Sequence, residues 1–152
     1  MTIADIQNGE AASSVRTKLN SVISEVNNRA IISAEAAVDI DAGQAVYITA
    51  ASVATLASAS TLAASYVAGL AAADTLTGVA VNIKRDTLTL ADWTAVTGTT
   101  TLTPGSVYYL SNITPGGLTT AAPDTTNHTL TRVGIASAAD TLSIQIEPPI
   151  IL

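Results

Sequence analysis

Residues 102–120 read LTPGSVYYLSNITPGGLTT, and this stretch decides the fold. Proline fixes φ at Pro104 and glycine accepts a positive φ at Gly105, so a type II turn is predicted with Thr103 at its first position. Residues 106–112 carry β-branched and aromatic side chains, which favour a strand. The chain is therefore predicted to turn tightly and to run directly into a strand.

The same stretch continues into a hairpin. Pro-Gly-Gly at residues 115–117 turns the chain back, and residues 118–120 are expected to return beside the strand. Side chains alternate along a strand, so Val107 and Tyr109 face one side while Tyr108 and Leu110 face the other. Both faces are at least half apolar. A strand of this kind is covered on both sides, either by its own domain or by another subunit.

A weaker copy of the pattern occurs earlier in the chain. Residues 41–49, DAGQAVYIT, align with residues 103–111, TPGSVYYLS, so that Gly43 falls on Gly105 and Tyr47 on Tyr109. Residues 67–71, VAGLA, likewise resemble residues 132–136, RVGIA, and Asp-Thr-Leu follows both. This similarity indicates two related half-domains, and the alternative is chance similarity among low-complexity β sequences.

The remaining sequence after residue 29 also favours β structure. Residues 31–49 read as a strand, an acidic turn and a second strand, and residues 50–64 as weak strands, with a helix as the alternative. In residues 76–83 the side chains of Val79, Val81 and Ile83 are expected on one face, and further strands are predicted at residues 87–90, 129–136 and 141–146. The only tryptophan, Trp93, is expected to plug one end of the core with its N–H satisfied. The apolar tail at residues 150–152 is expected to dock on a neighbour.

Residues 10–28 are predicted to form a helix, the one convincing helix in the sequence. Ala12, Val15, Leu19, Val22 and Val26 recur at spacings of three and four, which makes a heptad seam of about two repeats. A helix this short is marginal alone in water, so its seam packs either on its own β domain or on two further copies around an axis. We favour the trimer, because every copy then buries its seam. The sequence thus predicts two parts: an N-terminal arm and oligomerisation helix at residues 1–29, and a compact antiparallel β-barrel or sandwich at residues 30–152.

Composition excludes several classes of function. The chain has 6 basic and 12 acidic residues, for a net charge of −6, and so lacks the clustered cations that neutralise nucleic-acid phosphates. There is no cysteine, which excludes disulfides and thiolate metal sites. The uncharged stretch between Asp41 and Asp74 is interrupted too often by Ser, Thr and Gly to span a membrane. Only 3% of the residues are aromatic, so a small core is helped by burying surface between subunits.

No set of residues indicates catalysis. His128, the only histidine, lies in a polar loop without an evident nucleophile or orienting group, so we interpret it as a solvated residue. Asp39 and Asp41 lie on the same side of an extended segment and form a candidate cation pair, but such pairs more often solubilise a turn. We therefore predict no catalytic residue, no bound metal and no cofactor.

Residues 6–20, IQNGEAASSVRTKLN, resemble a signature of tailed-phage virion proteins, in which such a segment opens a short helix near the start of fibre and decoration subunits. The later sequence is similar to the small β domains of phage head-decoration and tail-fibre proteins. The best match runs from Trp93 through Gly98-Thr99 and LTPG at residues 102–105 to YYL at residues 108–110. Residues 117–119 and 132–136 also fit.

This resemblance implies a structural role in the virion without catalysis. The expected form is a homotrimer on the outer surface of the phage head, assembled in the bacterial cytoplasm, as a decoration, cement or head-fibre protein. Its expected partners are itself and the major capsid protein, with no nucleic acid, membrane or small-molecule substrate. Attachment is expected through Ile3 and Ile6, or alternatively through the β domain. Expected core and turn residues are Trp93, Pro104, Gly105, Tyr108, Tyr109 and Gly134.

A second class of function remains open. The chain is alternatively a short tail-fibre or receptor-binding protein that recognises the host cell surface. Its length favours decoration, because nothing in it resembles a long shaft or a separate adhesin tip. The scarcity of aromatic residues also argues against sugar binding, in which rings stack on the ligand.

Overall fold

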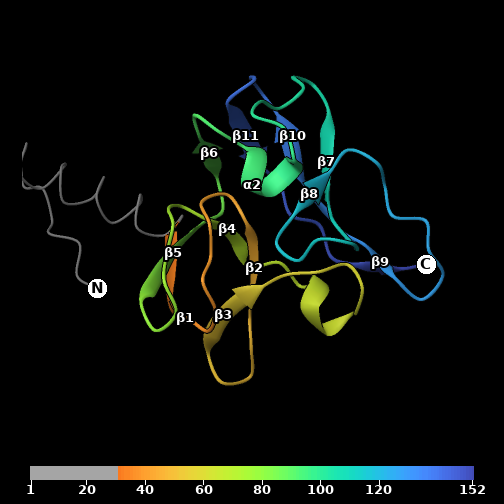
Figure 1. The fold of residues 1–152 in the computed structure, drawn as a ribbon. Coiled ribbons are helices and arrows are strands. Elements are labelled where there is room, and N and C mark those ends of the chain that lie inside the picture. Colours follow the sequence, from red (N-terminus) through yellow and green to blue (C-terminus); the bar gives the residue numbers. More distant parts are fainter. Residues whose placement is uncertain (1–30) are drawn as a thin grey trace, which may run out of the picture.

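A computed structural model describes residues 31–152, and the predicted arm and helix at residues 1–29 lie outside them. The described chain is mainly β, as predicted, and includes a closed five-stranded barrel and a separate five-stranded sheet (Figure 1). The barrel strands are β1 (Ile31–Ala36), β2 (Ala45–Ile48), β3 (Val53–Leu56), β4 (Gly69–Ala71) and β5 (Ala80–Lys84). The second sheet contains β6 (Thr87–Thr89), β7 (Val107–Leu110), β8 (Leu118–Thr119), β10 (Arg132–Ala136) and β11 (Thr141–Ile144). The other elements are η1 (Ala63–Ser65), α2 (Thr94–Thr97), β9 (Thr129–Leu130) and β12 (Ile150–Ile151).

The barrel has the strand order β1-β3-β2-β4-β5 and closes by pairing β5 with β1. Four of its five strand pairs are antiparallel, but β1 and β3 are parallel, with Glu35 opposite Val53 and Ala36 opposite Ala54. The prediction of a wholly antiparallel barrel was therefore wrong at this pair. Directions cannot alternate around a ring with an odd number of strands, so one pair has to be parallel.

The second sheet has the order β6-β11-β10-β7-β8, and all its pairs are antiparallel. It repeats the barrel's order, but its two end strands, β6 and β8, are not paired with each other. The registers also correspond, because Val46 lies opposite Gly69 in the barrel just as Tyr108 lies opposite Gly134 in the second sheet. The two sheets therefore follow one plan, closed in the first half and open in the second.

Gly69 and Gly134, which are aligned in the two halves, occupy corresponding positions in the two sheets. At Gly69 a Cβ atom would overlap the carbonyl oxygen of Lys84, and at Gly134 it would overlap the carbonyl oxygen of Ser143. Leu70 lies opposite Lys84 in the barrel, as Ile135 lies opposite Ser143 in the second sheet. Glycine is thus required at both positions because two strands approach backbone to backbone.

The predicted turns precede β2 and β7. Gly105 has φ +80°, and the Ser106 N–H donates to the Thr103 carbonyl at 3.1 Å, which confirms the type II turn at Pro104-Gly105. Gly43 has φ +86°, and the Gln44 N–H donates to the Asp41 carbonyl at 3.2 Å. The hairpin of β7 and β8 also forms as predicted, through a turn that includes Gly116.

The core consists of two clusters of apolar side chains. The smaller lies within the barrel and includes Ile40, Val46, Val81 and Ile83. The larger joins both halves, with Ala45 and Leu70 of the barrel beside second-half side chains such as Leu110. Its other buried second-half members include Leu88, Trp93, Val96, Leu102, Tyr108, Leu118, Val133 and Leu142. Because they share this cluster, the halves form one packed body.

Trp93 lies where it was predicted, fully buried in the larger cluster, and its Nε1–H donates to the Asp140 carbonyl at 3.0 Å.

Backbone hydrogen bonds also connect the two halves. The Gly116 N–H donates to the Ala57 carbonyl at 2.7 Å, and its carbonyl accepts from the Ala45 N–H at 2.9 Å. The turn between β7 and β8 is therefore held against the barrel.

One local prediction was wrong, and two others have a more specific outcome. Val79 does not share a face with Val81 and Ile83; it precedes β5, follows a turn at Gly78 and is 53% exposed. The strand β7 follows the predicted alternation, with Tyr108 and Leu110 buried on one face and Val107 and Tyr109 half-buried on the other. The backbone of the C-terminal tail pairs through β12 with β9 of its own chain, and its side chains remain exposed, so docking of the tail on a neighbour stays a prediction.

We predict that Gly134→Ala lowers the free energy of unfolding by about 1–3 kcal/mol, because the added methyl group overlaps the backbone of β11. Denaturant unfolding of the full chain measures the change. Thr101→Ala, at an exposed position, is the control and should change stability by less than about 0.5 kcal/mol. Equal stability of the two variants would mean that β10 and β11 do not approach as described.

Candidate functional site

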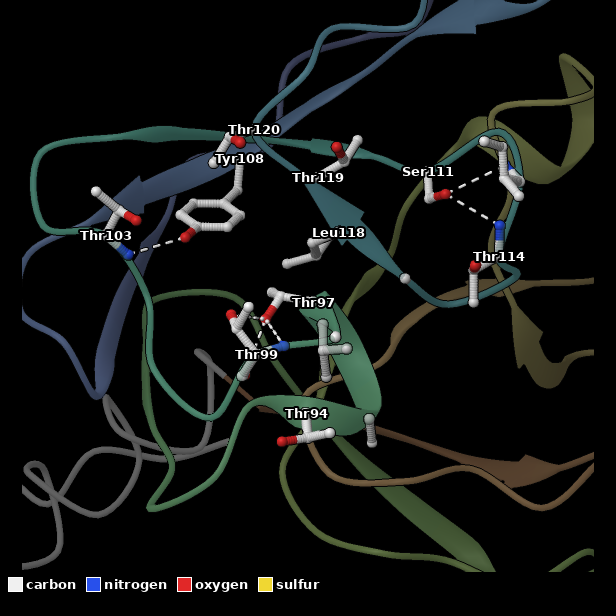
Figure 2. A pocket seen from close by; sticks show the side chains of 15 residues that line it. Thr94, Thr97, Thr99, Thr103, Tyr108, Ser111, Thr114, Leu118, Thr119 and Thr120 are labelled. Atoms are coloured by element: carbon white, nitrogen blue, oxygen red, sulfur yellow. Dashed lines mark hydrogen bonds between the residues drawn. The ribbon is translucent and has the colours of Figure 1, made fainter.

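A pocket with a volume of about 480 Å³ lies between α2 and β8 (Figure 2). Among residues 31–152 no charged side chain lines it, and every lining side chain that is not apolar carries a hydroxyl group. They are Thr94, Thr97, Thr99, Thr103, Tyr108, Ser111, Thr114, Thr119 and Thr120. Its volume is in the range of small-ligand sites, and its lining suits an uncharged partner that offers hydrogen bonds.

The helix α2 forms one wall of this pocket. It is a single turn anchored at its start by the buried Trp93 and stopped at Gly98, whose φ of +76° ends the helix. The Gly98 N–H donates to the Thr94 carbonyl at 3.0 Å. The Thr97 and Thr99 hydroxyls are hydrogen-bonded to each other at 3.0 Å, as Figure 2 shows. Local polar bonds therefore fix this wall.

The hairpin of β7 and β8 forms the opposite wall. The Tyr108 ring is buried there, and its hydroxyl accepts the Thr103 N–H at 3.0 Å (Figure 2). The Ser111 hydroxyl accepts the backbone N–H groups of Ile113 and Thr114 at 3.1 Å and 3.0 Å, which shapes the turn before β8. Leu118 is 4% exposed and belongs to the apolar part of the lining, with Ala95, Val96 and Ile113.

The residues predicted for function divide into two groups. The predicted oligomerisation residues Ala12, Val15, Leu19, Val22 and Val26 and the predicted attachment residues Ile3 and Ile6 lie outside the described residues. Among the predicted core and turn residues, Tyr108 lines the pocket, while Trp93 and Gly134 are buried away from its lining. Tyr109 lies in β7 opposite Thr119, and Pro104 and Gly105 form the turn before β7.

Sequence reasoning did not identify the pocket threonines. The internal alignment contained a clue to this site, because the connection between β6 and β7 is longer than the corresponding connection between β1 and β2. The extra residues contain α2, which provides one wall of the pocket. An insertion in one of two similar halves was thus the available clue.

The candidate cation pair has another role. The Asp39 carboxylate accepts both the backbone N–H and the hydroxyl of Thr77, each at 2.8 Å. These two bonds, the backbone one first, hold the pKa of Asp39 below its usual value. Within residues 31–152 no group of three or more potential metal-binding side chains comes together. Asp39 therefore ties the turn after β1 to the turn before β5.

His128 is not solely solvated, because its Nδ1 lies 3.0 Å from the Asn112 side-chain nitrogen. The sequence did not indicate this partner. Asn112 directly follows Ser111, and His128 directly precedes β9, so the contact joins two loops of the second half. Its geometry is that of a structural hydrogen bond.

An apolar surface lies at the C-terminal end of the chain. Tyr66, Ile150 and Ile151 are 58%, 60% and 62% exposed. A hollow of about 260 Å³ separates Tyr66 from Pro148 and Pro149. We call these five residues the C-terminal apolar surface. β12 satisfies part of its backbone through β9 but leaves its side chains in water, so this surface is suited to contact another protein.

None of the helices in residues 31–152 has the length and apolar character needed to cross a bilayer. In comparisons with known proteins, no family model matches the sequence and no curated protein matches it. The functional argument therefore depends on the residues and their geometry.

We predict that Thr77→Val raises the pKa of Asp39 part of the way to its usual value of 3.8, because the hydroxyl donor is lost and the backbone donor remains. A lowered pKa stabilises the fold above the unfolded-state pKa, and this contribution is lost as pH falls through the folded-state pKa. The variant should therefore lose less stability on acidification. NMR titration of the Asp39 carboxyl carbon measures the pKa.

Thr75→Val is the matched control, because the Thr75 hydroxyl donates to the Ala73 carbonyl and not to Asp39. An Asp39 pKa that is the same in both variants would contradict the assigned bond.

Proposed function

We propose that this chain is a structural protein of a tailed-phage particle that decorates or cements the head as a homotrimer on its outer surface. Its partners would be further copies of itself and the major capsid protein, and it would perform no catalysis. The observation that carries the proposal is the segment at residues 6–20, which resembles the start of phage fibre and decoration subunits.

The described body is compatible with this role. Its C-terminal apolar surface suits a contact with another protein chain. Residues 31–152 contain nine of the twelve acidic side chains but only three of the six basic ones. A net negative body with many threonines suits exposure to solvent around a particle.

We also propose that the two halves of residues 30–152 are related by duplication. The aligned sequences, the common strand order and the corresponding positions of Gly69 and Gly134 support this origin. In the proposed assembly, residues 1–29 provide the arm and the trimer helix, and the β domain projects outward. The protein would assemble in the bacterial cytoplasm and act on the virion without a cofactor.

A short tail-fibre or receptor-binding protein is the second candidate. The observation that favours it is the hydroxyl-lined pocket between α2 and β8, because such a pocket suits recognition of an uncharged surface group. Decoration is preferred, because the described residues place no exposed aromatic side chain in this pocket for stacking on a sugar.

We predict that Leu19→Asp weakens self-assembly by more than about tenfold, whereas His128→Ala changes it little. Leu19 is central to the apolar seam, and an unpaired carboxylate buried there costs several kcal/mol. Light scattering at micromolar concentration measures the mass of both variants and of the unmodified chain. A monomeric unmodified chain, or equal loss of assembly in the two variants, would place the interface elsewhere.

We predict that deleting residues 1–9 abolishes binding to phage heads that lack this protein. Ile3 and Ile6 are the apolar side chains of this arm and gain little by remaining in water. Cosedimentation with such particles, located by electron microscopy, measures binding. Ile151→Ser in the C-terminal apolar surface is the comparison variant and should still bind.

The possible results separate the proposals. Retained binding after the deletion, together with loss in Ile151→Ser, would transfer attachment to the β domain. Binding of the unmodified chain to tails alone would exclude the head assignment and favour the second candidate.

A further inference from the structure

In the barrel β1 lies beside β3, whereas in the second sheet no strand of residues 31–152 lies at the corresponding position beside β8. Ala54 lies opposite Ile48 in the hairpin of β2 and β3, and Leu118 lies opposite Leu110 in the hairpin of β7 and β8. On its other side Ala54 is paired with Ala36, and its carbonyl accepts the Ala37 N–H at 2.8 Å. Within the described residues β8 pairs only with β7, and the pocket lies along its other edge.

The strand that would fill this position ends too early. In the barrel Ile32 of β1 lies opposite Ile83, and in the second sheet Leu88 of β6 lies opposite Leu142. β1 continues to Ala36, but β6 ends at Thr89. The Leu90 N–H then donates to the Asp140 carbonyl at 2.9 Å, and the chain turns away into α2. The space next to β8 is consequently left as a pocket.

The backbone of Leu118 is directed into that space. The Ser111 N–H donates to the Gly117 carbonyl at 2.9 Å, so this carbonyl is directed toward β7, while the Gly117 N–H donates to the Thr114 carbonyl at 3.0 Å within the turn. Along a strand these directions alternate, and the N–H and carbonyl of Leu118 therefore point to the free edge. The Leu118 carbonyl is the counterpart of the Ala54 carbonyl, which accepts the Ala37 N–H in the barrel.

We propose that this pocket binds an extended peptide segment of another protein, with a small uncharged side chain facing inward, which pairs with β8 in parallel as β1 pairs with β3. One N–H of the segment donates to the Leu118 carbonyl. This is strand addition at a sheet edge, in which main-chain bonds provide affinity and side-chain pockets provide specificity. The site goes beyond the proposed function, which does not use this edge.

The barrel also indicates the chemistry of the segment. Ala36, whose side chain faces inward at this position, is 1% exposed, while Glu35 beside it is exposed. The pocket is lined by hydroxyl and apolar groups without a charge. A small uncharged side chain is therefore expected to face inward, because a charge there would lose hydration without gaining a partner. Outward side chains are unrestricted.

The test uses the barrel's own strand as a probe. A capped synthetic peptide with the sequence of residues 32–37, ISAEAA, is titrated into the isotopically labelled full-length chain. Saturable NMR shifts are expected at residues 117–120 and 94–99. A peptide with proline in place of the final alanine lacks the N–H that corresponds to Ala37, and it should bind at least about tenfold more weakly.

A pair of protein variants tests the location. Thr97→Arg places a long charged side chain at the pocket wall and should weaken binding by about tenfold or more. Thr101→Arg adds the same charge at an exposed position outside the lining and should bind as the unmodified chain does. Shifts that remain unchanged in Thr97→Arg, equal binding of the two peptides, or no saturable shift would overturn the proposal. Saturation of the same residues by a neutral oligosaccharide, without a response to the peptide, would also overturn it.

Discussion

Strand direction cannot alternate at every step around a ring of five strands, and the arrangement of both sheets depends on this constraint. The barrel meets it with one short parallel pair, in which β1 lies beside β3 for two residues. Parallel pairs are slightly less stable per residue than antiparallel ones. The second sheet repeats the order and register of the barrel but omits that pair, and α2 lies near the resulting gap. The pocket is thus a direct result of how the second half avoids the constraint.

The scarcity of aromatic side chains explains why the halves are packed together. Each sheet alone has mainly Ala, Val, Leu and Ile to bury, and these provide limited apolar area for a small core. The larger cluster therefore combines side chains from both halves around Trp93. Gly43 strengthens the contact from the barrel side, because its bare backbone lies against Leu90 and Val96. The shared cluster holds the open sheet against the closed barrel.

Much of this fold could be predicted from local sequence. Pro104-Gly105 specified its turn, the alternation in residues 107–110 specified β7, and the aligned glycines indicated the repeated plan. Strand pairing across the chain could not be predicted, because the parallel contact of Ala36 with Ala54 depends on ring closure and not on either residue. Val79 was misplaced because its apolar character matched the strand pattern while Gly78 had already fixed a turn before it.

The candidate site was less predictable than the fold. Threonines suit strands, turns and surfaces alike, so their type alone did not distinguish Thr97 or Thr119 from the many others. What makes them a site is an unpaired strand edge beside an inserted helical turn, and both arise only in three dimensions. The exposed side chains of β12 were predicted as an apolar tail. The strand that pairs with it, β9, was not predicted as its partner, because β9 is short and has no strong hydrophobic pattern.

The position of Trp93 has a practical consequence. It is the only tryptophan, it is fully shielded from water, and it immediately precedes the helical turn at the pocket. Its ring also belongs to the cluster shared by both halves. Intrinsic fluorescence excited at the tryptophan band therefore comes from one defined place, where separation of the halves and rearrangement of α2 would both change the emission. The protein thus has a built-in optical reporter at the junction of its two sheets.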